Sequence, residues 1–301
     1  MSSTLDPAAT QASPTQTSPT LAQLRAELDG IDDAIHDLLM RRGVVVEQVG
    51  THGAKGRVAI RPGREANILR RLLARHHGAL PARLLVRIWR ELFAATTSMQ
   101  GSYVIAVCEP DPAEGFVQAA REHFGALTPM RRHPTPAQAI GEVSSGLAIA
   151  AVLPMPQEQE PYAAAWWTAL LHRDEPRIHV VGRLPFWAPR SEGGPQAEAL
   201  VVAAVAPDAS SAEPGQDRSL IGLELSPDAS RARLAGALAA AGFDAASIIL
   251  RREQGDPAAQ ALVDVAGLVA DDDTRLSALT DMLRPPVVLG AYAVPLNGDS
   301  A

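Results

Sequence analysis

A single lysine stands among 26 arginines in this chain of 301 residues. Lys55 lies in a stretch whose other basic side chains are all arginines: Arg25, Arg41, Arg42, Arg57, Arg61 and Arg64. A guanidinium is a planar fork that matches carboxylates, whereas an ammonium is a compact point donor. A site that used both would hold carboxylates with arginines and place the lysine on one developing charge. Composition alone leaves open the alternative that Lys55 is an ordinary surface residue.

The spacing of two arginines bears on how such a site is assembled. Arg25 and Arg42 are 17 residues apart on one predicted helix, a separation of roughly 25 Å along the helix axis. They cannot both hold one small molecule within a single chain, but Arg25 of one chain can meet Arg42 of another in an antiparallel dimer. Thr96 and Gln100 are at positions i and i+4, so they share one face of a later predicted helix.

A long amphipathic helix is predicted to carry these arginines. Apolar side chains recur at intervals of three or four residues at Leu21, Leu24, Leu28, Ile31, Ile35 and Leu38. A helix of this length cannot be covered by its short neighbours, so the pattern favours packing on a partner chain. Two shorter helices are predicted at about residues 64–75, beginning with Arg64 and Glu65, and 82–99. Dimerisation is the natural way to bury a unit with so little internal core.

Composition excludes several classes of protein. The net charge of −7 gives no general footprint for nucleic acid. No apolar run is long enough for a membrane span and no secretory signal is visible, so a cytoplasmic protein is expected. Cys108, the single cysteine, excludes an intramolecular disulfide and a cysteine zinc site, and its apolar neighbours predict a buried strand thiol. No metal site is predicted.

Charge is distributed unevenly along the chain. Residues 21–95 contain 12 arginines and Lys55, whereas residues 193–301 are acidic. A basic segment in an acidic protein indicates a small anionic ligand, or only a solvated arginine face. We assign five of the arginines to solvated faces: Arg70, Arg71, Arg75, Arg83 and Arg87.

Four segments are predicted along the chain. Residues 1–19 are rich in Ser, Thr, Pro, Ala and Gln and read as a disordered tail. Residues 20–101 form an all-α three-helix domain, and residues 102–212 a shorter α/β domain with a helix expected at 161–171. Residues 217–296 show the order βαββαβ, which is typical of a ferredoxin-like fold, with its second helix at 274–283. The fold class is therefore multidomain.

Residues 21–100 resemble an all-helical chorismate mutase. The resemblance rests on segments in family-like order and spacing: Leu24-Arg25, Ile31-Asp32, Leu38-Leu39-Met40-Arg41-Arg42, Val49-Gly50, Arg61-Pro62-Gly63-Arg64-Glu65 and Thr96-Thr97-Ser98-Met99-Gln100. It implies an intertwined homodimer of three-helix chains. It also implies the pericyclic rearrangement of chorismate to prephenate, with no cofactor and no covalent intermediate.

The resemblance assigns a role to each residue of the predicted site, which comprises Arg25, Arg42, Lys55, Arg64, Glu65, Thr96 and Gln100. Arg25 from the partner chain and Arg42 hold the two carboxylates of chorismate, with Arg64 nearby and Thr96 helping to position one of them. Such clamps lock the folded conformer of the substrate. Lys55 and Gln100 donate to the ether oxygen, which gains negative charge in the transition state. Glu65 contacts the ring hydroxyl.

The lysine departs from the family register. The family's lysine position falls here at Gly53, and Lys55 lies two residues later, about 200° further round a regular helix. Either the helix is interrupted at Gly50 and Gly53 so that Lys55 reaches the site, or the lysine role is vacant. The first is favoured because no other lysine exists. Arg61 stands where bacterial members carry an acidic residue.

The rest of the chain resembles the prephenate dehydratase part of bifunctional enzymes, ending in an ACT-like regulatory domain. The resemblance covers Phe116 to Gly125, Ala137 to Gly146, Ala151 to Pro154 and Val288 to Tyr292. The family's Thr-Arg-Phe catalytic run is missing before residue 200. The effector loop, Gly-Ala-Leu in the family, reads Asp228-Ala229-Ser230 here. The middle region is therefore predicted to be an inactive remnant.

The sequence thus predicts a homodimeric chorismate mutase of phenylalanine and tyrosine biosynthesis with appended dehydratase-like and ACT-like regions. Two alternatives stay open. One is a bifunctional chorismate mutase/prephenate dehydratase. The other is a non-catalytic, amino-acid-sensing regulatory protein.

Overall fold

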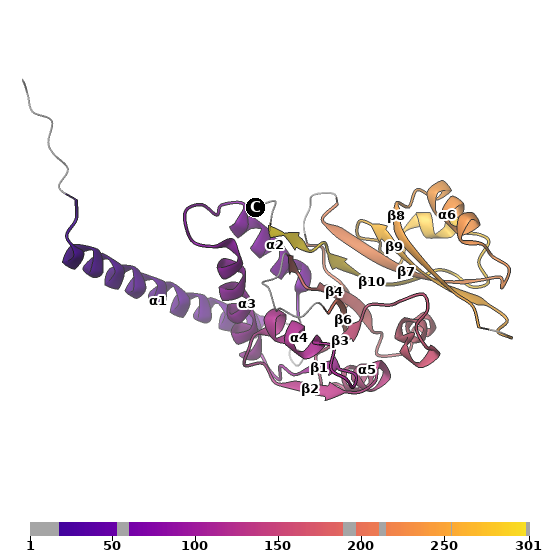
Figure 1. Ribbon diagram of the computed structural model, residues 1–301, viewed down its shortest axis with the longest axis horizontal. Helices are drawn as coiled ribbons and strands as arrows, with labels where there is room; N and C mark the ends of the chain where they lie inside the picture. Colours follow the sequence, from indigo (N-terminus) through magenta and orange to yellow (C-terminus); the bar gives the residue numbers. More distant parts are fainter. Residues whose placement is uncertain (1–17, 53–59, 189–196, 211–214, 254, 299–301) are drawn as a thin grey trace, which may run out of the picture. The chain divides into compact units, whose positions relative to one another are not determined.

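A computed structural model describes residues 18–52, 60–188, 197–210, 215–253 and 255–298 of the chain (Figure 1). They fall into two compact units, divided at Gly53 and Ala54. Lys55 and most of the predicted N-terminal tail lie outside the described residues. Among the described helices, none is long and apolar enough to cross a membrane.

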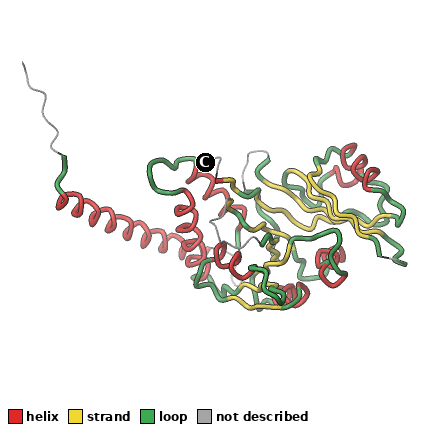
Figure 2. The backbone as a smooth tube through the Cα atoms, viewed as in Figure 1, coloured by secondary structure: helices red, strands yellow, loops and turns green. Residues whose placement is uncertain are grey.

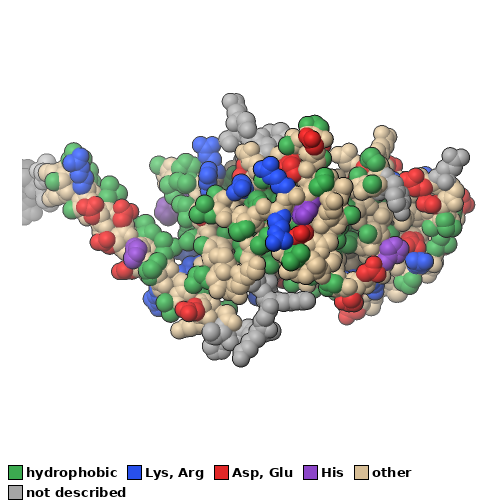
Figure 3. Space-filling view, turned by 90° about the horizontal axis from the view of Figure 1, so that it is seen from below, with side chains coloured by type: hydrophobic (Ala, Val, Ile, Leu, Met, Phe, Trp, Pro, Cys, Tyr) green, Lys and Arg blue, Asp and Glu red, His purple; other side chains and the backbone are tan. Residues whose placement is uncertain are grey.

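The first unit consists of α1 (Leu21–His52), the long helix expected from the sequence. It begins with a capping box, in which Thr20 Oγ1 accepts from the backbone N–H of Gln23 and the Gln23 side chain accepts from the backbone N–H of Thr20. The predicted apolar stripe is exposed along α1, with Leu28 at 59% and Leu38 at 64% of full exposure. Figure 3 shows hydrophobic side chains in green and acidic ones in red along this helix. Such a stripe requires a covering surface.

In the second unit, α2 (Pro62–Leu73) and α3 (Ala82–Ser98) pack together and against the α/β part of the chain. Leu69 of α2 is fully buried and Phe93 of α3 nearly so, in one cluster with Phe186 and Ala293. The expectation that dimerisation must bury the whole helical segment therefore needs correction in part for α2 and α3. Residues later in the chain, Phe186 and Ala293, cover part of their apolar surface, while Leu84 and Ile88 of α3 stay 40% and 42% exposed.

The α/β part begins as a doubly wound unit. In chain order its elements are β1 (Ile105–Cys108), α4 (Phe116–Phe124), β2 (Met130–His133), α5 (Pro136–Ser144) and β3 (Ala150–Pro154). β1 lies between β2 and β3 and is parallel to both. α4 packs on one face of this sheet and α5 on the other, because they contribute to different apolar clusters. β6 (Ala199–Ala203) and β4 (His179–Leu184) extend the sheet in antiparallel fashion.

The segment between β3 and β4 differs from the prediction. A helix was expected at 161–171, and the structure instead has two 3-10 helices, η1 (Tyr162–Ala164) and η2 (Trp166–His172). The Trp166 indole donates to the carbonyl of Pro154 at 3.0 Å and the Trp167 indole to Glu160 at 3.1 Å. Both buried indoles are thus held by groups that precede the segment. These tertiary hydrogen bonds accompany the tighter 3-10 geometry.

The C-terminal part has the expected ferredoxin-like order. Its elements are β7 (Asp217–Leu225), α6 (Arg231–Ala240), β8 (Ala245–Arg251), β9 (Ala259–Ala266), η3 (Thr274–Ala278) and β10 (Val287–Ala293). The sheet order β10-β7-β9-β8 is that of a βαββαβ fold. The predicted second helix at 274–283 is reduced to the 3-10 helix η3. Met282 bridges to Leu225 and the Leu283 N–H donates to Glu224, so the segment after η3 follows β7 instead of continuing a helix.

Both parts share one sheet with the order β2-β1-β3-β6-β4-β10-β7-β9-β8. Figure 2 draws the strands in yellow. The junction is the parallel pairing of β10 with β4 at Gly290 and Val180. Gly290 has φ of 136°, and a Cβ there would lie 2.1 Å from the Val180 carbonyl oxygen, so the close approach requires glycine. A short pair formed by β5 (Trp187–Ala188) and β11 (Leu296–Asn297) lies outside this sheet. The division into domains at 102–212 and 217–296 stays a prediction.

Candidate functional site

A basic pocket lies at the N-terminus of α2. It encloses about 420 Å³ and is lined by Arg61, Arg64, Asn67, Ile68, Arg71, Asp208 and Ala209. Asp208 caps the helix, accepting from the backbone N–H of Gly63 at 3.0 Å and of Arg64 at 3.2 Å. The Arg61 Nε lies 3.4 Å from the same carboxylate. Three guanidinium groups against one carboxylate leave a net positive pocket, which suits an anionic ligand.

The predicted site residue Glu65 lies on α2 and is paired with a buried arginine. Arg90 Nη1 donates to Glu65 Oε2 at 2.8 Å, and the two side chains are 4% and 19% exposed. Burial raises the pKa of Glu65; Arg90 opposes that rise and Asp208 adds to it. Sequence reasoning gave Arg90 no role. Its position opposite Glu65 depends on how α3 packs on α2, and no local pattern shows that.

The two site residues predicted on α3 differ in their surroundings. Thr96 is half-buried, and its hydroxyl donates to the carbonyl of Leu92 at 2.6 Å. Gln100 is exposed and follows the end of α3. Arg64, Glu65, Thr96 and Gln100 therefore all belong to the second unit.

The other predicted residues belong elsewhere. Arg25 and Arg42 lie on α1 in the first unit, as the helical pattern predicted. Arg25 is exposed, and the partial burial of Arg42 lowers the pKa of its guanidinium. The predicted interruption at Gly50 is wrong, because α1 continues through it to His52. Gly53 and Lys55 lie outside the described residues, so the role of Lys55 stays a prediction. One more arginine was misjudged: Arg70 donates to Ser210 Oγ at 2.5 Å, to the Gln216 carbonyl and to the Val294 carbonyl, so it is no solvated residue.

The N-terminus of α4 is a second place where an anion is expected to bind. In a doubly wound sheet, ligands bind at the carboxyl ends of the strands where the strand order reverses, here between β1 and β3. Glu109 follows β1 and occupies this position itself. Its Oε1 accepts from the N–H groups of Glu114 at 2.7 Å and Gly115 at 3.0 Å, and its Oε2 from Val117 at 2.7 Å. The chain thus supplies its own anion to this helix.

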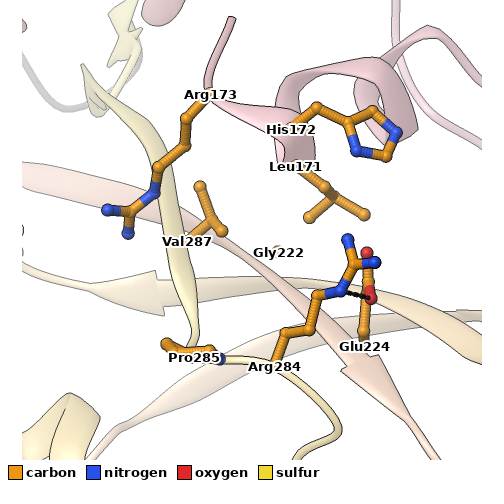
Figure 4. A pocket seen from close by; sticks show the side chains of 8 residues that line it. All are labelled: Leu171, His172, Arg173, Gly222, Glu224, Arg284, Pro285 and Val287. Carbon is orange, nitrogen blue, oxygen red and sulfur yellow. Dashed lines mark ion pairs between the residues drawn. The ribbon is translucent and has the colours of Figure 1, made fainter.

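A smaller pocket of about 250 Å³ lies where η2 meets β7 and β10 (Figure 4). Arg284 and Glu224 line it and form an ion pair at 3.2 Å. Gly222 keeps it open toward η2, because a Cβ there would lie 2.3 Å from Leu171 Cδ2. With Arg173 as its one further arginine, this pocket carries less positive charge than the arginine pocket at α2 and is less suited to a dicarboxylate.

Cys108 is the buried strand thiol expected from the sequence, at the end of β1. Burial raises the pKa of the thiol to about 11, with smaller contributions from Glu109 and Glu114. Within the described part of the chain, no three His, Cys, Asp or Glu side chains are grouped to hold a metal ion.

Comparison with known proteins identifies the helical segment. Residues 24–101 match the model of the family described as chorismate mutase type II. These residues therefore form a chorismate mutase domain, of a family whose members are isomerases. The chain is also 33% identical over 128 residues to the bifunctional chorismate mutase/prephenate dehydratase of Aquifex aeolicus. That match covers 41% of this chain and about a third (34%) of the relative's length.

Two solved structures are similar to about two thirds of this chain. One, described as GqqA, a novel type of quorum quenching acylase, is 19% identical; the match covers 64% of this chain and 96% of that one, with a TM-score of 0.46. The other is prephenate dehydratase from Streptococcus mutans, with 17% identity, 64% and 98% coverage and a TM-score of 0.44.

Proposed function

We propose that this protein is a chorismate mutase that converts chorismate to prephenate in aromatic amino acid biosynthesis. The observation that carries the proposal is the family match over residues 24–101. The arginine pocket at α2 supports it, because chorismate is a dicarboxylate and guanidinium forks bind carboxylates with defined geometry.

The reaction needs orientation and electrostatics from the protein and no covalent step. One C–O bond breaks and one C–C bond forms in a single cyclic shift of electrons. Arg42 and Arg64 hold the substrate carboxylates with Arg25, and Thr96 helps to orient one of them, so that the reactive conformer is favoured.

Two donors act on the ether oxygen as it gains charge, and one acceptor binds the ring hydroxyl. Lys55 and Gln100 are the proposed donors, and they stabilise the transition state more than the ground state. Glu65 is the proposed acceptor. No cofactor takes part.

A second copy of the chain is proposed to complete the site. Arg25 and Arg42 are too far apart on α1 to hold one small molecule. The exposed apolar stripe of α1 gives a second copy a surface to cover. We propose a cytoplasmic homodimer in which Arg25 reaches the site of the partner.

The alternatives differ in their products. The Aquifex aeolicus relative favours a bifunctional mutase and dehydratase. Against it, Glu109 fills the N-terminus of α4, where an anionic substrate of the α/β part is expected to bind. The altered effector loop, in turn, gives the amino-acid-sensing alternative no support from its residues.

Incubating the purified full chain with chorismate and resolving the products separates these readings. Prephenate alone is the expected result. Phenylpyruvate would establish the bifunctional enzyme. Absence of both products would contradict mutase function and leave the sensor.

A further inference from the structure

We propose that Arg90 is a positioning residue of the mutase site, and that the α/β part of the chain holds it in place. The α/β part then has a function that needs no activity of its own: it fixes the geometry of Glu65. This inference rests on the proposed function and assigns a role to residues outside the family segment.

Arg90 is enclosed by groups from three other parts of the second unit. Its Nη1 donates to Glu65 Oε2 on α2 at 2.8 Å and lies 3.4 Å from His123 Nε2 on α4. Its guanidinium carbon lies 4.9 Å from the centre of the Phe186 ring, which follows β4. Only 4% of the side chain is exposed. The α/β part thus contributes two of the three groups around this guanidinium.

The contacts of Arg90 specify the charge states of His123 and Glu65. Arg90 donates toward His123 Nε2, so that nitrogen is an acceptor and the imidazole is neutral. Burial and the nearby guanidinium lower the pKa of His123 well below its usual value. Leaving one member of a buried ion pair alone is strongly unfavourable, so Arg90 fixes Glu65 as a carboxylate in one place.

Glu65 keeps capacity for substrate after this pairing. Arg90 bonds Oε2, and the side chain remains 19% exposed. Across the described residues, no hydrogen bond to Oε1 is found. A carboxylate has acceptor positions on both oxygens, so a ring hydroxyl can donate to Oε1 while Arg90 holds Oε2.

The pairing has a consequence for the pH dependence of turnover. Four charged or titratable groups lie near Glu65: Arg90 on α3, Asp208 before β7, Tyr103 before β1 and, beyond Arg90, His123 on α4. Burial and Asp208 raise the pKa of Glu65, and Arg90 lowers it. Without Arg90, Glu65 takes up a proton at higher pH and loses an acceptor for the ring hydroxyl. The acidic limb of the kcat/KM profile then moves to higher pH.

The test compares Arg90→Met with Arg70→Met as a matched control. Arg70 also reaches from α2 to the C-terminal part, through Ser210, Gln216 and Val294. We expect Arg90→Met to lower kcat/KM by about 10- to 100-fold and to move the acidic limb upward by about one pH unit. Arg90→Lys should restore part of the rate, because an ammonium can still donate to Glu65. Arg70→Met should leave the limb where it is.

A second variant keeps the proposal testable if Arg90→Met does not fold. Phe186→Leu keeps Arg90 and an apolar neighbour, and should shift the limb in the same direction by a smaller amount. If both Arg90→Met and Phe186→Leu keep wild-type turnover and an unmoved acidic limb, the role of Arg90 is overturned, while the proposed function stands. An equal shift in Arg70→Met would overturn it as well. A wild-type chain that makes no prephenate would overturn the proposed function, and this inference with it.

Discussion

Two helices of the second unit, α2 and α4, begin next to a carboxylate. The two helix N-termini differ in how many N–H groups the carboxylate accepts from and in the basic side chains around it. At α2, Asp208 comes from far along the chain and bonds two N–H groups, within a pocket that also presents Arg61, Arg64 and Arg71. At α4, Glu109 lies just before the helix and bonds three N–H groups with both oxygens. At α2, three guanidinium groups line the pocket beside its one carboxylate.

The difference shows how a helix N-terminus gains or loses the capacity to bind an anion. Every helix offers N–H groups and a partial positive charge there. When the chain supplies a carboxylate at this position, as Glu109 does for Val117 and for the two N–H groups just before α4, an internal anion already occupies the end of the helix. When guanidinium groups exceed the internal carboxylate, as at α2, attraction for an external anion remains.

The largest effect on turnover is expected at the N-terminus of α2. Arg64→Ala removes a proposed carboxylate clamp and should lower kcat/KM for chorismate by about 10²- to 10³-fold. Steady-state kinetics measure it. Arg71→Ala is the matched control, because Arg71 lines the same pocket without an assigned role, and only a few-fold change is expected. Equal losses for both would show that the pocket acts by general charge and not by a specific clamp.

Lys55→Ala should lower kcat by about 100-fold, because the donor to the developing charge on the ether oxygen is lost. Arg57→Ala, which removes a neighbouring cation, should change kcat little. Single-turnover kinetics on both variants separate chemistry from binding. A loss of only a few-fold in Lys55→Ala would show that the lysine role is vacant, while the arginine clamps could still stand.

A change at the N-terminus of α4, where Glu109 is bound, should alter the stability of the protein and not its turnover. Glu109→Ala leaves three N–H groups at α4 without their acceptor and should lower the free energy of unfolding by about 1–2 kcal/mol. Denaturant unfolding measures the change, with Glu114→Ala as control because only the backbone of Glu114 takes part. Mutase kcat should stay the same. A fall in kcat without a fall in stability would mean that Glu109 serves the reaction.

The smallest effect is expected at a neutral cap. Thr135 Oγ1 accepts from the N–H of Gln138 at 3.4 Å at the start of α5. Thr135→Ala should therefore cost only about 0.5–1 kcal/mol. Comparing its unfolding midpoint with that of Glu109→Ala measures how much more the charged, three-fold cap contributes. Equal costs would contradict the distinction.

Local patterns predicted much of the fold. The apolar periodicity of α1, the buried strands β1 and β3 and the ferredoxin-like order after residue 217 follow from spacing and composition. The 3-10 helices η2 and η3 escaped prediction, because their geometry depends on tertiary hydrogen bonds such as that from Trp166 to Pro154. The junction of the two sheet halves at Gly290 was equally hidden, since the pairing of β10 with β4 spans over a hundred residues.

Prediction of the site from the sequence was limited in the same way. Family spacing placed Glu65 on α2, but not its partner Arg90, whose position depends on the packing of α3 and on Phe186. Arg70 was assigned to solvent because a helix face with several arginines is usually solvated. Its acceptors at Ser210, Gln216 and Val294 are distant in sequence. Partners of this kind are invisible until the chain is folded.

A mixing experiment with two inactive variants tests the central claim, a chorismate mutase site completed by a second copy, most directly. Arg25→Ala and Arg42→Ala should each lose prephenate formation by about 100-fold or more. Co-expressed in one cell, they should regain roughly a quarter of the wild-type rate, because half of the dimers are mixed and each mixed dimer has one intact site of two. Activity no higher than that of the single variants, beside an active wild type, would contradict the shared site.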